Sequence, residues 1–152
     1  MRLVLYEPDI PQNAGTMLRM AACLGVPVDI IEPCGFVFSD RHMKRAGMDY
    51  LDQVEVIRHA SWEHFTESRA NRSGRLVLLS TRAEQSYTDF RFKSDDVLIV
   101  GRESAGVPDT VHEAVEARLR IPMQPNLRSL NVAMSAAMVL GEALRQTSGF
   151  PE

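Results

Sequence analysis

The twelve residues VLIVGRESAGVP, at positions 97–108, carry the clearest structural signal in the chain. They begin with four consecutive apolar residues, a run that is typical of a strand buried on both faces of a parallel sheet. Two glycines follow within six residues, which indicates that the backbone comes close to another group there, and Pro108 opens a short helix. A similar apolar run occupies residues 76–79. Buried strands that run into helices predict an α/β domain around a mostly parallel sheet flanked by helices.

The same alternation of strand and helix patterns extends over the rest of the sequence. Further strands are expected at residues 3–6, 26–31, 54–57 and 119–121. Further helices are expected at residues 12–24, 61–70 and 131–146, and one short capped helix at 39–45. No repeat or long linker interrupts this order. With 152 residues, the length predicts a single domain, residues 1–152.

Composition and charge exclude several classes of protein. The chain is 45% hydrophobic and 24% charged, as in an average soluble domain, and its net charge of −3 excludes a protein held to nucleic acid by bulk positive charge. Fifteen of the basic residues are arginines and two are lysines, which reflects either a coding bias or a use for the planar guanidinium. No apolar run is long enough to span a membrane, and the opening residues do not resemble a secretory signal. A cytoplasmic protein is therefore expected.

The expected last helix is apolar on nearly every side. Small or apolar residues fill most of positions 132–140. A helix of this kind is buried, either in the core or against another subunit. Both interpretations stay open, and the limited size of the domain favours a helix that is partly an interface between two subunits.

The common enzyme and metal motifs are missing. Neither G-x-G-x-x-G after the first strand nor a Walker A motif occurs, and in GRESAG the serine stands one place too late for a nucleophile elbow. The four histidines lack metal-ligand spacing, so no metal is expected. Cys23 and Cys34 match no redox or zinc spacing and are expected to be reduced core residues.

Polar and turn residues gather after three expected strands, where ligands bind in open α/β sheets. Residues 8–15 lead into Arg19, and Asn13 is expected either to cap the following helix or to serve a site. Residues 100–108 form either a ligand loop or an ordinary tight turn.

The third polar segment, residues 121–131, is the densest of the three. Capping of the last helix explains either Ser129 or Asn131. It does not explain Arg128, Ser129 and Asn131 together behind a loop stiffened by two prolines. A binding site is therefore favoured here.

Taken in order, these segments resemble the SpoU branch of the SPOUT superfamily, the RNA ribose 2'-O-methyltransferases. The matching motifs are Asn13-Ala14-Gly15 with Arg19, then Gly101-Arg102-Glu103-Ser104-Ala105-Gly106-Val107-Pro108, then Ile121-Pro122-Met123 with Ser129-Leu130-Asn131-Val132-Ala133. The short length, the opening at residues 5–13 and the segments 31–36 and 45–50 resemble the minimal tRNA (cytidine/uridine) 2'-O-methyltransferases of the wobble nucleotide. An arginine often precedes the second glycine of motif two in this family, whereas Ala105 stands here.

The resemblance implies a C-terminal trefoil knot, a homodimer that pairs through the C-terminal helix, and S-adenosylmethionine as cofactor, with S-adenosylhomocysteine as product. It places the cofactor-binding residues at Leu79, Gly101, Glu103, Ile121, Ser129 and Leu130. It assigns catalysis to Arg19, with Ser129 and Asn131 holding the ribose. Because an arginine is a poor general base, Arg19 is expected to orient the phosphate and the 2'-hydroxyl.

The implied partner is tRNA, bound by Asn13, Arg19, Arg41, Lys44, Arg45 and Arg128. Two other functions remain open. The chain either methylates a different tRNA or rRNA nucleotide, or it is a catalytically silent dimer that binds RNA. The intact motifs argue against the silent form.

Overall fold

The computed structural model describes residues 1–39, 41 and 50–152, and within them seven strands form one sheet. Every pairing in this sheet is parallel, in the order β3-β2-β1-β6-β4-β7-β5. The strands are β1 (Arg2–Tyr6), β2 (Val28–Ile31), β3 (Val56–His59), β4 (Leu76–Leu79), β5 (Gln85–Ser86), β6 (Val97–Val100) and β7 (Ala117–Arg120). The predicted α/β class with a parallel sheet is confirmed.

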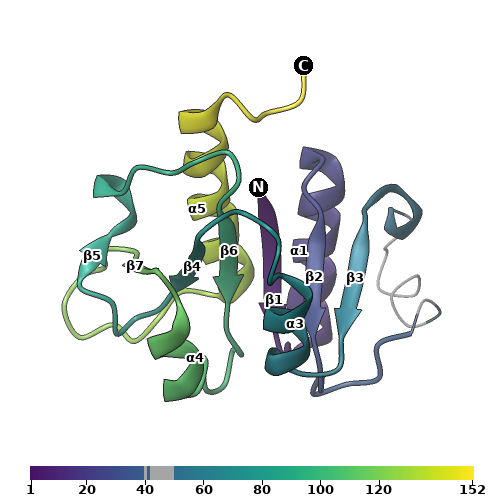
Figure 1. Ribbon diagram of the computed structural model, residues 1–152. Coiled ribbons are helices and arrows are strands. Elements are labelled where there is room, and N and C mark those ends of the chain that lie inside the picture. Colours follow the sequence, from purple (N-terminus) through teal and green to yellow (C-terminus); the bar gives the residue numbers. More distant parts are fainter. Residues whose placement is uncertain (40, 42–49) are drawn as a thin grey trace.

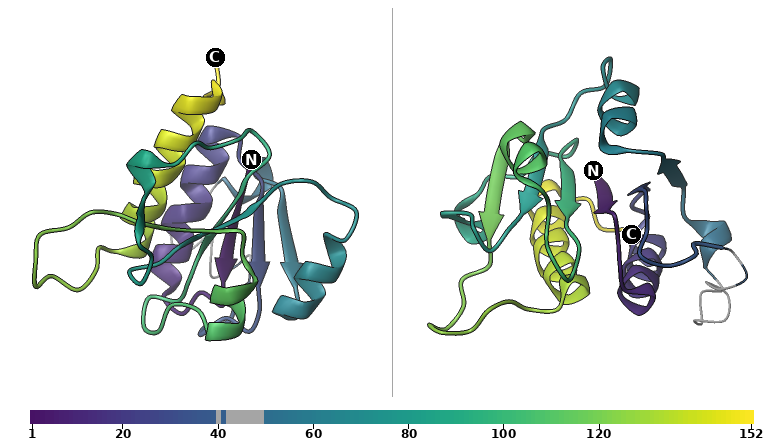
Figure 2. Two further views of the ribbon diagram at one scale, coloured as in Figure 1. Left: turned by 60° about the vertical axis from the view of Figure 1, so that its left-hand side comes forward. Right: turned by 90° about the horizontal axis from the view of Figure 1, so that it is seen from below.

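Helices cover both faces of the sheet. They are α1 (Pro11–Leu24), α3 (Trp62–Ser68), α4 (Asp109–Ala114) and α5 (Val132–Thr147), with single 3-10 turns at Leu51–Gln53 and Tyr87–Asp89. Figure 1 shows α3 and α4 in front of the sheet and α1 and α5 behind it, and Figure 2 shows the same layers from two other sides. None of the helices in the described part of the chain is long and apolar enough to cross a membrane.

The central strands are continuous apolar runs because both of their faces are covered. All four residues of β6 are buried. One buried cluster fills the space between the sheet and the helices α1 and α5, and a second fills the space on the side of α3 and α4. Among the buried residues of α5 are Ala136, Val139 and Leu140, so this helix is part of the core.

The order of the strands places the polar loops side by side. From β1 the chain passes to β2 on one side, while β6 pairs with β1 on the other. Such a reversal opens a crevice at the carboxyl ends of the strands. The next strands along, β4 and β7, end at the same edge because all pairings are parallel. Three polar segments of the sequence therefore meet at one edge.

The predicted element boundaries shift by a few residues. Residues 26 and 27 precede β2, because the Val26 N–H bonds to Ala21 at the end of α1. The predicted strands at 54–57 and 119–121 are found at Val56–His59 and Ala117–Arg120. The two-residue strand β5 was not predicted. The expected helix at 39–45 lies outside the described residues except for positions 39 and 41.

The structure excludes one alternative and contradicts one prediction. The alternative that Asn13 caps α1 is excluded, because α1 begins earlier, at Pro11, after an N-cap residue, Ile10, whose side chain makes no capping bond. Cys23 is exposed on α1 and is not a core residue, whereas Cys34 is partly buried. Burial raises the pKa of the Cys34 thiol to about 11.

Candidate active site

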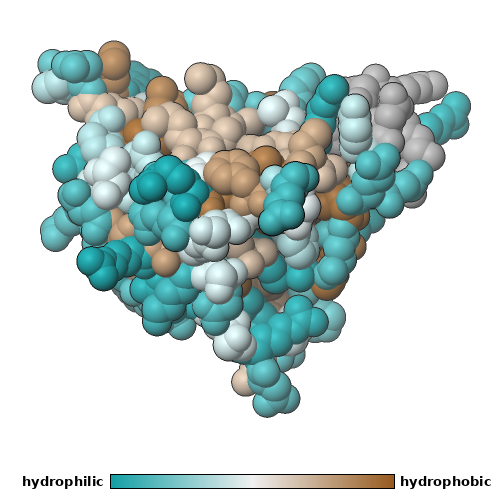
Figure 3. All heavy atoms as spheres, turned by 90° about the horizontal axis from the view of Figure 1, so that it is seen from above, coloured by the Kyte–Doolittle hydropathy of each residue, from teal (hydrophilic) through white to brown (hydrophobic). Residues whose placement is uncertain are grey.

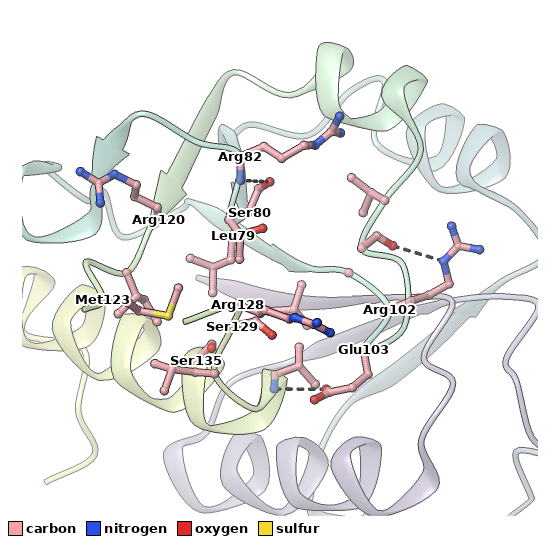
Figure 4. Close-up of a pocket in the computed structure, with 18 of the residues that line it drawn as sticks. Leu79, Ser80, Arg82, Arg102, Glu103, Arg120, Met123, Arg128, Ser129 and Ser135 are labelled. Atoms are coloured by element: carbon pink, nitrogen blue, oxygen red, sulfur yellow. Dashed lines mark hydrogen bonds between the residues drawn. The ribbon is translucent and has the colours of Figure 1, made fainter. Parts of the chain in front are cut away.

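A cavity of about 770 Å³ lies beyond the carboxyl ends of β4, β6 and β7. Its volume is within the range of natural small-molecule pockets. The lining comes from three loops: residues 79–82, residues 100–109, and residues 119–130 with the first turn of α5. Figure 4 shows these loops facing one another around the open space.

The loop after β6 is folded tightly on itself. Arg102 and Gly106 exchange backbone hydrogen bonds of 2.9 and 3.0 Å. Gly106 has φ +60°, a left-handed conformation, and a Cβ on Gly101 would lie 2.7 Å from the Gly106 carbonyl carbon. Gly101 and Gly106 therefore allow the close backbone approach that the sequence predicts. Both glycines line the cavity.

Glu103 joins all three motif segments. Its Oε2 accepts a hydrogen bond from Asn13 Nδ2 at 3.0 Å and another from the Val132 N–H at 3.2 Å. The contact with Asn13 spans 90 residues of sequence. Glu103 thus fixes the loop after β6 to the start of both helices behind the sheet.

Asn131 completes the network and begins α5. Its Oδ1 accepts the N–H groups of Ala133 at 2.9 Å and Met134 at 3.2 Å, so Asn131 is the predicted helix cap. Its Nδ2 donates to Asn13 Oδ1 at 2.9 Å. Asn13, Glu103 and Asn131, each from a different motif, are therefore in direct contact.

Asp9 was not predicted as a site residue. Its carboxylate accepts the backbone N–H groups of Glu103 at 3.0 Å and Ser104 at 3.3 Å, and also the Ser104 hydroxyl. Partial burial acts to raise the pKa of Asp9, but these hydrogen bonds outweigh burial and hold the pKa below its usual range. No local pattern signals this role, because the partners lie more than ninety residues away.

The expected cofactor residues lie around the cavity. Leu79, Ile121 and Leu130 are apolar parts of its lining, and Gly101 and Ser129 also line it. Leu130 is 38% exposed, so part of its side chain is accessible to a ligand.

Arg128 and Ser129 face the cavity without partners in the described structure. Both residues are exposed and line the cavity. In Figure 4 the Arg128 side chain extends across the lower part of the space. These two side chains are free to bind a ligand.

Arg19 does not line the cavity. It is exposed on α1, with its guanidinium carbon 4.9 Å from the centre of the Tyr50 ring. Arg41 is also exposed. Lys44 and Arg45, expected to contact RNA, lie outside the described residues.

Four arginines line the cavity, and three of them are engaged. Arg102 donates to Glu7 at 3.4 Å and points away from the space in Figure 4, and Arg120 donates to the Glu84 carbonyl at 3.1 Å. Arg82 pairs with Asp109 at 2.8 Å and lowers the pKa of that carboxyl. The residues described in the structure contain no cluster of three or more metal-ligating side chains.

Comparison with known proteins identifies the family. Residues 1–141 match the model of the SpoU rRNA Methylase family. A protein of Beijerinckia indica subsp. indica named tRNA (cytidine(34)-2'-O)-methyltransferase is 64% identical over 144 residues, which cover 95% of this chain and 90% of that protein.

Solved structures agree with this match. One, described as "Structural insights into the 2-OH methylation of C/U34 on tRNA", has a TM-score of 0.90 and 42% identity, covering 97% of this chain and 96% of that one. The SpoU methyltransferase AviRb from Streptomyces viridochromogenes, solved with the cofactor AdoMet, has a TM-score of 0.84 and 26% identity over 96% of this chain and 60% of that one. The chain belongs to the SpoU rRNA methylase family.

Proposed function

We propose that this chain transfers the methyl group of S-adenosylmethionine to the ribose 2'-hydroxyl of nucleotide 34, a cytidine or uridine, in tRNA. The main support is the hydrogen-bonded contact of Asn13, Glu103 and Asn131 beside the cavity. It joins one polar side chain from each of the three SpoU motifs. The names of the relative from Beijerinckia indica and of the 42% identical structure support the choice of nucleotide.

The residues of the cavity fit a cofactor with a nucleoside end. Leu79, Ile121 and Leu130 offer apolar surface for a purine, and the close approach of Gly101 to Gly106 leaves backbone groups accessible beside it. A cavity of about 770 Å³ is large enough for such a molecule. When bound, the cofactor supplies an activated methyl group.

The chain's own part in the reaction is to orient and bind. Ser129 lines the cavity and Asn131 begins α5 two residues later, and we assign the binding of the target ribose to both. Arg19 lies on the exposed face of α1, outside the cavity lining, so it acts on the RNA and positions the phosphate and 2'-hydroxyl. An arginine is a poor general base, so we do not assign Arg19 the role of proton acceptor. Positioning of this kind supplies much of the acceleration of a group transfer.

RNA binding is assigned to five cations and one amide of the sequence. These are Asn13, Arg19, Arg41, Lys44, Arg45 and Arg128, of which Lys44 and Arg45 lie outside the described residues. A few local phosphate contacts do not require a positive net charge, so they are compatible with the net charge of −3. The RNA affinity that they provide falls steeply as the salt concentration rises.

A homodimer would cover the free face of α5. Met134 is 60% exposed and Met138 41% exposed, and Ala137 between them is also exposed. Seen from above, atoms of hydrophobic residues form a band across the upper part of the view (Figure 3). A continuous apolar face on a soluble protein is typical of a protein interface.

We also assign the C-terminal part a trefoil knot. The chain leaves β7, forms the cavity loop at 121–131 and returns behind the sheet as α5, which lies beside α1. The end of α5 meets the segment before β6, where Gln146 donates to the Phe90 carbonyl at 3.0 Å and accepts the Phe92 N–H at 2.9 Å. The similarity to SpoU structures over almost the whole chain supports this path.

Incubation with labelled S-adenosylmethionine and total tRNA, followed by mapping of the methylated nucleotide, tests the proposal. The expected product carries a 2'-O-methyl group at nucleotide 34. Methylation at another tRNA or rRNA nucleotide would contradict the wobble assignment. RNA binding without cofactor binding in calorimetry would instead identify a silent dimer.

The assignment of Arg19 has its own test. Arg19→Ala is expected to lower kcat on tRNA and to leave cofactor affinity unchanged, because Arg19 lies outside the cavity lining. An unchanged turnover rate would remove Arg19 from the mechanism.

A further inference from the structure

The cavity has a charged rim as well as an apolar lining. S-adenosylmethionine ends in an amino acid, whose carboxylate and ammonium must be received somewhere outside the apolar part of the site. A neighbouring cation and anion that are both accessible would bind the two ends of such a zwitterion with charge-assisted hydrogen bonds, which are stronger than neutral ones.

Most charged groups of the lining are already engaged. Glu103 accepts hydrogen bonds from Asn13 and the Val132 N–H, and Arg102 points away from the space toward Glu7. Arg120 donates to the Glu84 carbonyl. None of these three side chains therefore belongs to a pair in which both the cation and the anion are accessible to a ligand in the cavity.

Arg82 and Asp109 do form such a pair. Their closest nitrogen and oxygen atoms are 2.8 Å apart, and the side chains are 54% and 79% exposed. An exposed pair stabilises a fold very little, so ligand groups can replace or join it at small cost. The guanidinium has five N–H donors and the carboxylate several acceptor positions, so each partner retains binding capacity.

The place of Arg82 in the chain also suits this role. It stands three residues after Leu79, on the same loop, which limits the backbone between them to about 10 Å. The Arg82 N–H donates to the Ser80 hydroxyl at 3.1 Å, which braces the turn that directs the side chain. Figure 4 shows Arg82 extending along the upper edge of the cavity. A ligand whose nucleoside contacts Leu79 therefore has Arg82 within reach.

We infer that the Arg82–Asp109 pair receives the amino-acid end of the cofactor, with Arg82 binding the carboxylate and Asp109 the ammonium. The inference rests on the proposed use of S-adenosylmethionine. Arg128, also in the lining, is a single cation without an anionic partner among the described residues, so it matches only one of the two charges.

Calorimetry with three related thioethers tests this assignment. S-adenosylhomocysteine has both charged groups, its decarboxylated form S-adenosyl-3-thiopropylamine keeps the ammonium, and methylthioadenosine has neither. Arg82→Ala is expected to weaken S-adenosylhomocysteine roughly tenfold, as for one charged hydrogen-bonded contact, and to leave the other two unchanged. Asp109→Asn is expected to weaken both ligands that carry the ammonium and to leave methylthioadenosine unchanged.

Arg120→Ala is the matched control, because Arg120 lines the same cavity, and Arg128→Ala tests the competing cation of the lining. Equal weakening of all three ligands by Arg82→Ala, or no weakening, would overturn the inference. Selective loss of S-adenosylhomocysteine binding in Arg128→Ala, with Arg82→Ala unaffected, would overturn it in favour of Arg128. If the wild-type protein binds none of the thioethers, the proposed cofactor itself is wrong, which distinguishes that failure from an error about Arg82.

Discussion

The carboxylate of Asp9 accepts the backbone N–H of Glu103 at 3.0 Å and so connects the loop after β1 to the loop after β6. Glu103 in turn accepts hydrogen bonds from Asn13 and from the first residue of α5. Asp9 therefore positions a group of the site without lining the large cavity itself.

Asp9→Ala should lower cofactor affinity and kcat, because the loop from 103 to 104 loses three hydrogen bonds. We expect a loss of about 1–3 kcal/mol in the free energy of unfolding as well. Calorimetric titration and chemical denaturation measure the two effects. Glu67→Ala, on α3 and outside the cavity lining, is the control for loss of an exposed carboxylate. An Asp9→Ala protein with wild-type kcat and affinity would contradict the positioning role.

The contribution of Asp9 to stability should depend on pH. Its pKa in the folded protein lies below the ordinary value of 3.8, so the folded state favours the charged form. The stability it provides is therefore fully present above that ordinary value and is lost as the pH falls through the lower folded pKa. Denaturation of wild type and Asp9→Ala from neutral pH to about pH 2.5 should show a constant difference at first and a shrinking one below about pH 4. A difference that grows in acid would be inconsistent with this carboxylate.

Asn131 combines two functions that substitution can separate. Asn131→Ala removes the cap of α5 and should cost about 1 kcal/mol of stability. Asn131→Asp keeps a capping oxygen for Ala133 and Met134 but loses the Nδ2 donor to Asn13. We expect Asn131→Asp to retain most of the stability, and both variants to lose turnover. Thermal denaturation and a single-turnover methylation assay measure the two properties. A fully active Asn131→Asp enzyme would show that the contact with Asn13 is dispensable.

Gly101→Ala should disturb the cavity without unfolding the protein. A Cβ there would lie 2.7 Å from the Gly106 carbonyl carbon, so the loop from 102 to 106 must shift. We expect cofactor affinity to fall at least tenfold, because this loop lines the site. Calorimetry checks the affinity, and circular dichroism checks the fold. Unchanged affinity would mean that the ligand does not contact this loop.

Met138→Glu should convert a dimer to a monomer. The side chain lies on the exposed apolar face of α5, and in the proposed two-fold interface the substitution would bury two unpaired carboxylates, one from each subunit. Light scattering after size exclusion measures the mass. Thr110→Glu, which adds the same charge at an exposed position of α4, should leave the dimer intact. A wild-type protein that is monomeric would exclude the interface outright.

The sequence predicts the elements whose pattern is a consequence of burial. Residues 97–100 and 76–79 read as buried strands because helices cover both faces of the sheet. The two-residue strand β5 has no periodicity to read, and it pairs only with β7 at the edge. Element existence therefore follows from the sequence more reliably than element ends.

The sequence predicts part of the membership of the candidate site but not the contacts within it. Asn13 looks like a helix cap in the local sequence, yet its side chain bonds to residues 90 and 118 positions away. The contacts of Asp9 with Glu103 and of Arg82 with Asp109 also join loops that are distant in the sequence. The parallel sheet brings these loops to one edge. Contacts of this kind depend on the topology, which local patterns do not encode.

Helix α5 begins at the candidate site and continues through the core. Asn131 and Val132 hold the network around Glu103, while Leu144, buried at the far end, is about 20 Å away along the helix axis. A close-packed helix responds to a larger side chain by moving as a unit. A bulkier residue at Ala136 or Ala143 would therefore displace the end of α5 at the candidate site as well as the core. Selection for methyl transfer thus also acts on core residues of α5 that no substrate touches. The substitutions that this helix tolerates are limited by the position that its first turn must keep.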